Sequence, residues 1–525
     1  MKKLRIFLLA SVALGLSTTS CDKFLDINTN PNSPTSATPD LILPQAIVRV
    51  AALEPSFNNY GNALVGYWAN AGGFSGWGSF VSYNYTTADY SGLFSSSFKA
   101  IEDLDQVVIM SEGDASKAIY AAAAKVLQVY SFQNLVDVYN DVPYTEALKG
   151  VKGLQPKYDK AEDVYKALAD TLDVAMSTLS ANSTSTQFKA ADKLFKGDLT
   201  KWLQFANTIK LRLILRSDGK VSFSNTSFNS AGFLKDDALV NPGYEDNSGK
   251  QSPMWGSWAY TPSGANAGST AYIPTHYIMA MYDGTKITDP ARVAMMYSKG
   301  TSVPRNQLGY QGADAQKGVV PCAWYVYTGS SPSKAGAAKI GILKGPGQGQ
   351  PLMLAAESYF LQAQANLQGI VGTSADAKAN FENGIKASYN YLAKTPEGTI
   401  TPGYNATTFL ATYISDNATS KLVNFDACTT DEERLEAIVT QQYIAYNMIL
   451  GHQAWFEYQR TGYPRNVMPN TLANNKVCFS SFVSEATAAD KLPTRVLYPE
   501  SEFRYNSGNV PTGVDKYTSK IFWAK

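Results

Sequence analysis

The residues of this chain best suited to binding chemistry are aromatic. Its 525 residues include 32 Tyr, 23 Phe and 8 Trp, whereas histidine occurs only at His276 and His452. A flat ring with polar neighbours can hold the C–H face of a sugar and needs no reactive group. Because much catalytic chemistry depends on paired histidines, the composition favours binding over catalysis.

The aromatic residues that we expect to be most exposed to solvent lie in loops. One stretch is Phe74–Tyr85, and the others fall in the middle of the chain, where glycines and serines flank Trp255 and Trp258. Trp and Tyr offer a large contact area at a small cost in conformational entropy. Packing within the loops is the alternative interpretation for each ring. The residues that we predict to contact a ligand are Trp77, Tyr83, Tyr85, Trp255, Trp258, Tyr260 and Trp324.

The signatures of common enzymes are missing from the sequence. There is no H-E-x-x-H, G-x-S-x-G or P-loop pattern. Glycoside hydrolysis needs only two suitably spaced carboxylates, so a helical glycoside hydrolase or polysaccharide lyase is the alternative function. The acidic pairs Asp236-Asp237 and Glu432-Glu433 lie near predicted helix starts, where the helix dipole accounts for them. We therefore predict no catalytic residue, no metal site and no cofactor, and a formal charge of +1 argues against nucleic-acid binding.

The N-terminus has the form of a secretory signal peptide. Residues 1–20 contain three basic residues, the apolar run Ile6–Leu16 and a small polar tail, and Cys21 follows directly. A bacterial lipoprotein carries its acyl chains, palmitate among them, on such a cysteine. Signal removal leaves a formal charge of −2, which favours an acyl anchor over electrostatic attachment. Cleavage elsewhere, with Cys21 an ordinary thiol, is the alternative.

Beyond the signal peptide we predict an extended tether over residues 21–39, because Asn, Pro and Ser dominate it. The three remaining cysteines, Cys322, Cys428 and Cys478, match no zinc-ligand spacing, so buried apolar positions are expected for them.

The elements that position the loops are helices. Val164, Leu168, Leu172, Ala175 and Leu179 recur at helical spacing, and Ala115–Val136 is apolar nearly all round, as in an internal helix. We predict a mostly α fold: an α-solenoid frame of tetratricopeptide-like helix pairs bearing long irregular aromatic loops. The predicted domain spans residues 40–525, with a loop-rich insertion at about 239–351. The predicted pairs are 90–111 with 114–138, 160–180 with 198–217, 352–368 with 374–394, and 431–448 with 451–461.

Six stretches resemble, in the same order, motifs of the SusD/RagB family of nutrient-binding outer-membrane lipoproteins. They differ from those motifs in details, such as Asn140 where the family has Gly and Gln364 where Glu is common. The stretches are Cys21–Asn32, Val136–Leu148, Trp202–Arg216, Ala356–Ala365, Leu435–Ala445 followed by Ala454–Pro464, and Arg495–Pro499.

The resemblance implies a function as well as a fold. Members of the family capture oligosaccharides, and sometimes peptides, at the exterior of the outer membrane, held there by the N-terminal acyl anchor. They act as the lid of a SusC-type TonB-dependent transporter, and catalysis is not expected. Contact with the transporter is then a further alternative for the loop aromatics, and a purely structural adaptor on the transporter is a further alternative function.

Overall fold

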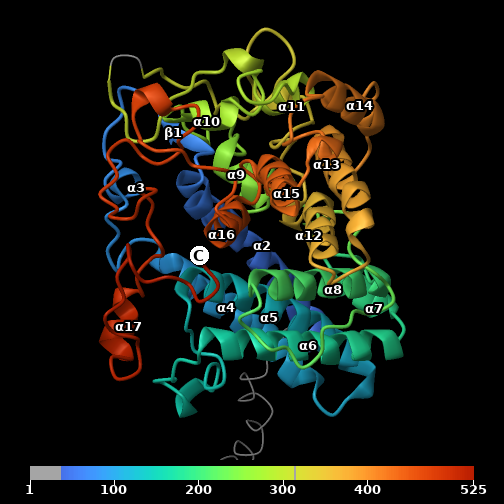
Figure 1. Cartoon of the computed structure of the whole chain (residues 1–525). Helices are drawn as coiled ribbons and strands as arrows, with labels where there is room; N and C mark the ends of the chain where they lie inside the picture. The colour runs from blue at the N-terminus through green and yellow to red at the C-terminus, as the bar shows by residue number, and fades with distance from the viewer. Residues whose placement is uncertain (1–36, 313–314) are drawn as a thin grey trace, which may run out of the picture.

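The computed structural model describes residues 37–312 and 315–525, and helices dominate this part of the chain (Figure 1). The predicted signal peptide, Cys21 and nearly all of the predicted tether lie outside the described residues. The long helices are α2 (Pro39–Leu64), α4 (Ser91–Ser111), α5 (Ala118–Tyr139), α6 (Ala161–Ala181), α8 (Leu199–Arg216), α12 (Ala355–Leu367), α13 (Ala377–Ala393), α14 (Ala406–Asp416), α15 (Asp431–Tyr446) and α16 (Gly451–Thr461).

Short elements complete the described fold. They are helices α3 (Ser79–Ser82), α7 (Thr186–Ala191), α9 (Pro253–Trp258), α10 (His276–Met279), α11 (Pro290–Met296) and α17 (Glu500–Tyr505), and strands β1 (Trp68–Asn70), β2 (Ala238–Val240), β3 (Tyr272–Pro274) and β4 (Gln350–Met353).

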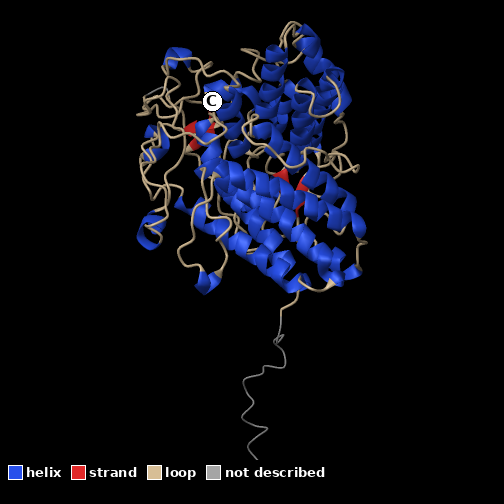
Figure 2. Cartoon of the chain, turned by 60° about the horizontal axis from the view of Figure 1, so that its bottom comes forward, coloured by secondary structure: helices blue, strands red, loops and turns tan. Residues whose placement is uncertain are grey.

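The long helices form two groups joined by α2. In Figure 1, α4, α5, α6 and α8 pack in sequence in the lower half, and α12, α13, α15 and α16 lie above them. The first long helix, α2, contacts α4, α5 and α16 and so belongs to both groups. Figure 2 shows that the long loops gather on one side of this helical body.

All eight helices of the predicted pairs are present, and the prediction of a mostly helical fold is confirmed. The apolar positions predicted for 160–180 are buried in α6, and α5 is buried on nearly every side, as expected of an internal helix. The predicted pairs did not include α2. It contains Pro44 and Pro55, and internal prolines remove backbone donors and argue against a helix.

A network of buried charges connects the two groups of helices. On α8, Arg212 Nη1 lies 2.9 Å from Glu357 Oε1 of α12, and Arg216 Nη1 lies 2.6 Å from Asp137 Oδ2 of α5. Arg216 also reaches Glu457 of α16, at 3.2 Å. All of these side chains are at most 2% exposed. Because a buried charge is tolerated only when it is paired and hydrogen-bonded, these contacts fix how the groups meet.

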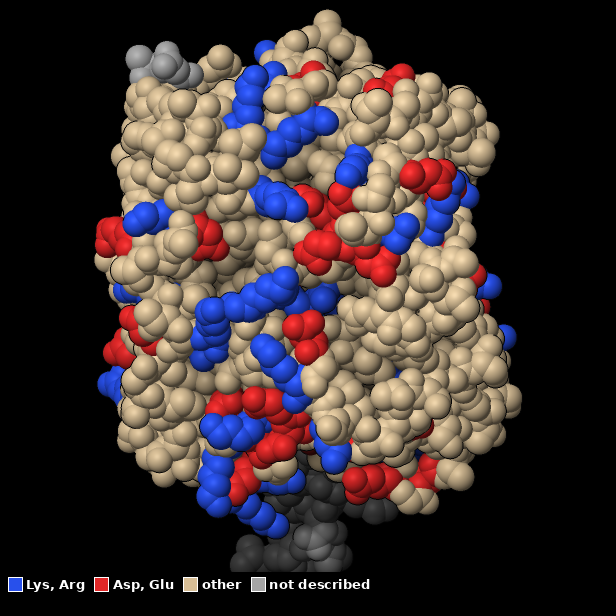
Figure 3. All heavy atoms as spheres, viewed as in Figure 1, with Lys and Arg blue, Asp and Glu red and all other residues tan. Residues whose placement is uncertain are grey.

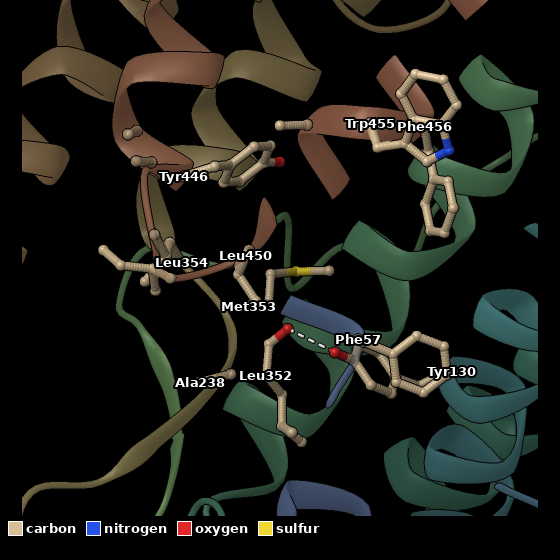
Figure 4. Close-up of a cluster of buried hydrophobic side chains, with 14 of the residues drawn as sticks. Phe57, Tyr130, Ala238, Leu352, Met353, Leu354, Tyr446, Leu450, Trp455 and Phe456 are labelled. Carbon is tan, nitrogen blue, oxygen red and sulfur yellow. Dashed lines mark hydrogen bonds between the residues drawn. The ribbon is translucent and has the colours of Figure 1, made fainter. Parts of the chain in front are cut away.

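The predicted insertion at 239–351 leaves and rejoins the helical frame at one point. At its two ends β2 pairs with β4 in antiparallel register, with Val240 opposite Gln350. The carbonyl of Leu352, on β4, accepts a hydrogen bond from Tyr130 within the buried cluster of Figure 4. The strand pairing and this hydrogen bond therefore attach both ends of the insertion to the core of the helical frame, and its loops extend to the surface.

The three cysteines beyond Cys21 are buried, as predicted, and all three are free thiols. Within the described residues, no helix is both long and apolar enough to cross a bilayer.

Candidate functional site

The loops predicted to meet a ligand converge on a short two-stranded ribbon. Strand β1 pairs with β3 in antiparallel register, so that Asn70 faces Tyr272 and Trp68 faces Pro274. The two strands lie about two hundred residues apart in the sequence. The ribbon therefore brings the Phe74–Tyr85 stretch against the loops of the 239–351 segment.

Five aromatic rings form one continuous set beside this ribbon, which we call the ribbon aromatic cluster: Trp68, Trp77, Trp258, Tyr272 and Trp324. Tyr272 is its centre, with ring centroids 4.7 Å from Trp68, 5.1 Å from Trp77 and 5.3 Å from Trp258. The Trp258 ring in turn lies 5.9 Å from that of Trp324. Edge-to-face contacts of this kind are favourable beyond the buried area, so the cluster is a rigid platform.

Only two rings of the ribbon aromatic cluster are partly exposed, namely those of Trp77 and Tyr272. Trp77 lies on a loop in which Gly76 and Gly78 have φ of +87° and +44°, with open space at the Cβ position of each. Glycine adopts such positive φ angles readily, and here they turn the backbone sharply on either side of Trp77. Trp258 is 9% exposed, whereas Trp68 and Trp324 are fully covered.

A polar pocket of about 420 Å³, which we call the ribbon pocket, adjoins the same ribbon. Its wall is tied to β1, because Asn306 Nδ2 donates to the Asn70 carbonyl at 2.8 Å and the Gly72 N–H donates to the Gln316 carbonyl. The residues that line it are His276, Ser302, Val303, Arg305, Asn306, Tyr310, Gln316, Leu472 and Asn475.

The basic groups that line the ribbon pocket are one guanidinium and one imidazole. Arg305 Nη1 is held by Asp283 Oδ2 at 2.5 Å. Burial, with the positive charges of Arg305 and Lys476, lowers the pKa of His276 to about 4, so this imidazole is neutral at pH 7. Hydroxyl, amide and guanidinium groups beside partly exposed rings are suited to binding a polyhydroxylated ligand. Figure 3 shows few charged side chains on the loops at the upper left.

The structure places Trp255 and Tyr260 in a separate set of rings. Their centroids lie 5.9 Å and 5.3 Å from Tyr325, and Tyr325 stacks on Tyr327. The expectation that glycine and serine neighbours leave Trp255 and Trp258 uncovered is wrong. The Trp255 side chain is fully buried and that of Trp258 is only 9% exposed, because α9, which carries both, packs against α2.

Tyr83 and Tyr85 belong to a third set, centred on Tyr90. The Tyr85 and Tyr90 centroids are 5.3 Å apart, and Tyr83 accepts a hydrogen bond from the Ser481 N–H. Tyr83 and Tyr85 are 0% and 1% exposed. Ligand contact by all seven predicted residues stays a prediction, and in this arrangement Trp77 offers the most accessible ring among them.

The carboxylates considered for glycoside hydrolysis are engaged in the frame. Glu432 and Glu433 lie in the first turn of α15, as expected. Asp237 precedes β2 along the chain, yet its Oδ1 accepts a hydrogen bond from the Ala355 N–H at the start of α12, and Asp236 pairs with Lys201. Across the described residues, no three His, Cys, Asp or Glu side chains lie close enough together to hold a metal ion.

Sequence reasoning missed Tyr272, Arg305, Asn306 and Tyr310. No feature of the neighbouring sequence distinguishes these four residues, because their position at the site depends on the pairing of β1 with β3. A short apolar run such as Tyr272–Pro274 gives too weak a signal to reveal its distant partner.

Comparison with known proteins settles the family. Over residues 31–499 the sequence matches the SusD-like profile, whose description is starch-binding and associating with the outer membrane. The chain belongs to the SusD/RagB family. A search of curated protein sequences finds no significant match.

Solved SusD-like structures share the fold over nearly the whole chain. A SusD homologue of Bacteroides fragilis is 20% identical, with a TM-score of 0.64 over 93% of this chain and 99% of the other. A SusD/RagB family protein of Bacteroides thetaiotaomicron is 16% identical, with a TM-score of 0.66 over 93% and 99%. A chitin-binding SusD homologue of Flavobacterium johnsoniae is 19% identical, with a TM-score of 0.64 over 92% and 98%.

Proposed function

We propose that this SusD-like protein captures oligosaccharides at the cell surface and delivers them to a SusC-type TonB-dependent transporter, for which it acts as the lid. Peptides are the second class of ligand. The protein is held to the outer membrane by acyl chains on Cys21 and faces the exterior. Family membership supports an outer-membrane-associated protein that binds nutrients, and one relative of the same fold is described as chitin-binding.

The observation that carries the proposal is the pairing of partly exposed rings with a polar pocket on one ribbon. Trp77 and Tyr272 supply flat apolar surface, and the ribbon pocket supplies amide and hydroxyl groups nearby. A sugar ring has one face of C–H groups and a rim of hydroxyls, so it needs both kinds of contact. Catalysis forms no part of the proposal.

Binding of the soluble mature chain, with Cys21 removed, to a panel of glycans and peptides tests the proposal. We expect saturable binding without turnover. Trp77→Ala and Tyr272→Ala should each weaken binding about tenfold, equivalent to ~1.4 kcal/mol. Tyr505→Ala is the matched control, because Tyr505 is an aromatic residue that is 65% exposed and lies at the lower end of the molecule.

Three results would contradict the proposal. If ligand binds and neither ring variant weakens it, the site is wrong. If the purified protein converts the ligand into a product, the functional class is wrong. If no glycan or peptide binds while the acylated protein still co-purifies with a SusC-type transporter, the protein is a structural adaptor.

A further inference from the structure

The most exposed large hydrophobic side chains of the described residues gather at one place. Val151 is 87% exposed, Leu154 76% and Tyr505 65%, and no other large hydrophobic residue of ranges 37–312 and 315–525 exceeds these values. Phe503 adds a side chain that is 40% exposed. We call these four residues the lower apolar surface. Single exposed apolar residues need no explanation, but a cluster of the most exposed ones marks an interaction site.

The lower apolar surface is held in place by its own hydrogen bonds. Leu154 and Tyr505 border the same apolar cleft of about 240 Å³, which Phe94 and Phe98 of α4 also line. Across it, Gln155 Nε2 donates to the Tyr505 carbonyl at 3.1 Å. Two further bonds join the loop to the segment that begins with α17: Asn506 Nδ2 donates to the Pro156 carbonyl, and Tyr158 donates to Glu502. These bonds fix the C-terminal base of the loop, residues 155–158, against α17 and the residue after it.

Positive charges surround the exposed apolar side chains. The tip reads Lys149-Gly-Val-Lys-Gly-Leu154, so each apolar residue follows a lysine by two positions. Neither lysine of the tip, nor Arg504 beside Tyr505, forms an ion pair with any described residue. Of the neighbouring acidic groups, Glu146 is paired with Lys157 and Glu502 accepts from Tyr158, whereas Asp105 is close enough to Lys149 for the lysine charge to act on it. Glu500, at the other end of α17, forms no ion pair with a described residue.

This surface lies at the end of the molecule where the described chain begins. In Figure 1 the loop around Gly150–Lys152 is at the bottom, and the start of α2 lies in the same lower half. Figure 3 shows Lys and Arg side chains, interspersed with Asp and Glu, at the lower left edge of the same end. Between Cys21 and the first described residue, Ala37, are 15 residues, which span at most about 50–60 Å. An acyl anchor at Cys21 would therefore keep this end near the bilayer.

We propose that the lower apolar surface contacts the membrane directly, with Val151 and Leu154 entering the interface of an anionic lipid surface and Lys149 and Lys152 meeting its phosphates. Apolar tips flanked by lysines suit this interface, because the apolar side chains leave water while the ammonium groups stay among the headgroups. The inference rests on the membrane attachment of the proposed function. It assigns a second point of contact that orients the body, whereas a lone tether would leave the body free to rotate.

Vesicle binding by the soluble mature chain lacking Cys21 tests this contact without the acyl anchor. Co-flotation would use vesicles of phosphatidylethanolamine and phosphatidylglycerol at 3:1, with pure phosphatidylcholine vesicles for comparison. We expect the wild-type chain to bind the anionic vesicles. The double variant Val151→Asp/Leu154→Asp should lower the partition coefficient at least tenfold, and Val151→Trp should raise it. Lys149→Ala and Lys152→Ala should each lower it about fivefold on anionic vesicles and little on neutral ones.

The controls separate this contact from ligand capture. Both tip residues point into solvent, so the melting temperature of the aspartate variant should match that of the wild type. Trp77→Ala should leave vesicle binding unchanged, and the aspartate variant should leave glycan binding unchanged. The proposal is overturned if the wild-type chain does not float with anionic vesicles, or if the aspartate variant floats equally well. It is also overturned if the aspartate variant loses only the transporter in co-purification, because the surface is then a protein interface.

Discussion

Replacement of Glu54 by Gln should remove a decrease in the free energy of unfolding that the wild type shows as the pH rises from 6 to 8. Glu54 lies on α2, is 1% exposed, and has its Oε1 2.7 Å from the Tyr130 hydroxyl. That hydroxyl is also 2.9 Å from the Leu352 carbonyl, and its single proton can serve only one of the two acceptors. If the proton goes to the Leu352 carbonyl, whose hydrogen bond with Tyr130 is the dashed line in Figure 4, a protonated Glu54 must supply the other hydrogen bond. Glu54 is then a neutral acid within the core.

The electrostatic surroundings of Glu54 agree with this assignment. Burial raises its pKa to about 8, against the opposing effects of Tyr130 and Arg212, and the nearby Glu357 raises it further. His452 Nε2 lies 3.8 Å from Glu54 Oε2. Burial, together with the Arg212 and Arg216 charges, keeps the pKa of this imidazole well below its usual value, so it adds no compensating positive charge.

The sign of the effect follows from linkage. The folded chain holds a proton on Glu54 up to about pH 8, whereas the unfolded chain releases it near 4.5. Between these values the folded state binds more protons, so its stability falls as pH rises, by up to ~1.4 kcal/mol per pH unit. From pH 6 to pH 8 the loss amounts to roughly 2 kcal/mol. Gln carries no titrating proton and has an N–H that can replace the carboxyl donor.

Urea denaturation of the wild type and Glu54→Gln at several pH values measures this effect. The free energy of unfolding of the variant, relative to wild type, should increase by roughly 2 kcal/mol between pH 6 and pH 8. Glu102→Gln is the control, because Glu102 is exposed, and its difference from wild type should stay flat. A constant difference for Glu54→Gln across this range would refute the neutral assignment.

Two further predictions concern the frame and the site. Arg212→Met leaves Glu357 buried without its partner, so it should lower the free energy of unfolding by about 3–5 kcal/mol. Arg212→Met/Glu357→Leu should recover most of this loss, and equal stabilities of all three proteins in urea would contradict the pairing. Trp258→Ala should cost about 3–5 kcal/mol, because the ring is 9% exposed and packs on Tyr272 and Trp324. Trp77→Ala should cost much less by the same measurement. Equal decreases in the free energy of unfolding would mean that the Trp77 side chain is as deeply packed as that of Trp258.

The sequence predicted the helical frame well because its signals are local. In α6 the apolar residues recur every three or four positions, and the same positions are buried, so one window of the chain contains the whole pattern. In α2 the local signal fails, because Pro44 and Pro55 count against a helix that is held by its neighbours α4, α5 and α16. Tertiary packing outweighs propensity there.

The candidate site was harder to predict because the type of an aromatic residue does not reveal how much of its side chain is exposed to solvent. Trp255 and Trp77 both have glycine neighbours, yet Trp255 is fully buried where α9 packs against α2, and Trp77 is partly exposed on its loop. The difference arises from contacts with α2 and from the β1–β3 pairing, which join residues far apart in the chain. No local feature carries that information.

The positions of the two proposed surfaces bear on how capture and delivery would be coupled. The β1–β3 ribbon lies in the upper half of Figure 1, and the lower apolar surface lies at the bottom. With the lower surface on the membrane, the ribbon pocket would face the medium, which suits capture. Delivery into a transporter would then require this contact to break, so a contact of few residues serves better than a large one. Two apolar side chains and two lysines give reversible attachment, as a single acyl chain does, and release of the body need not detach the anchor.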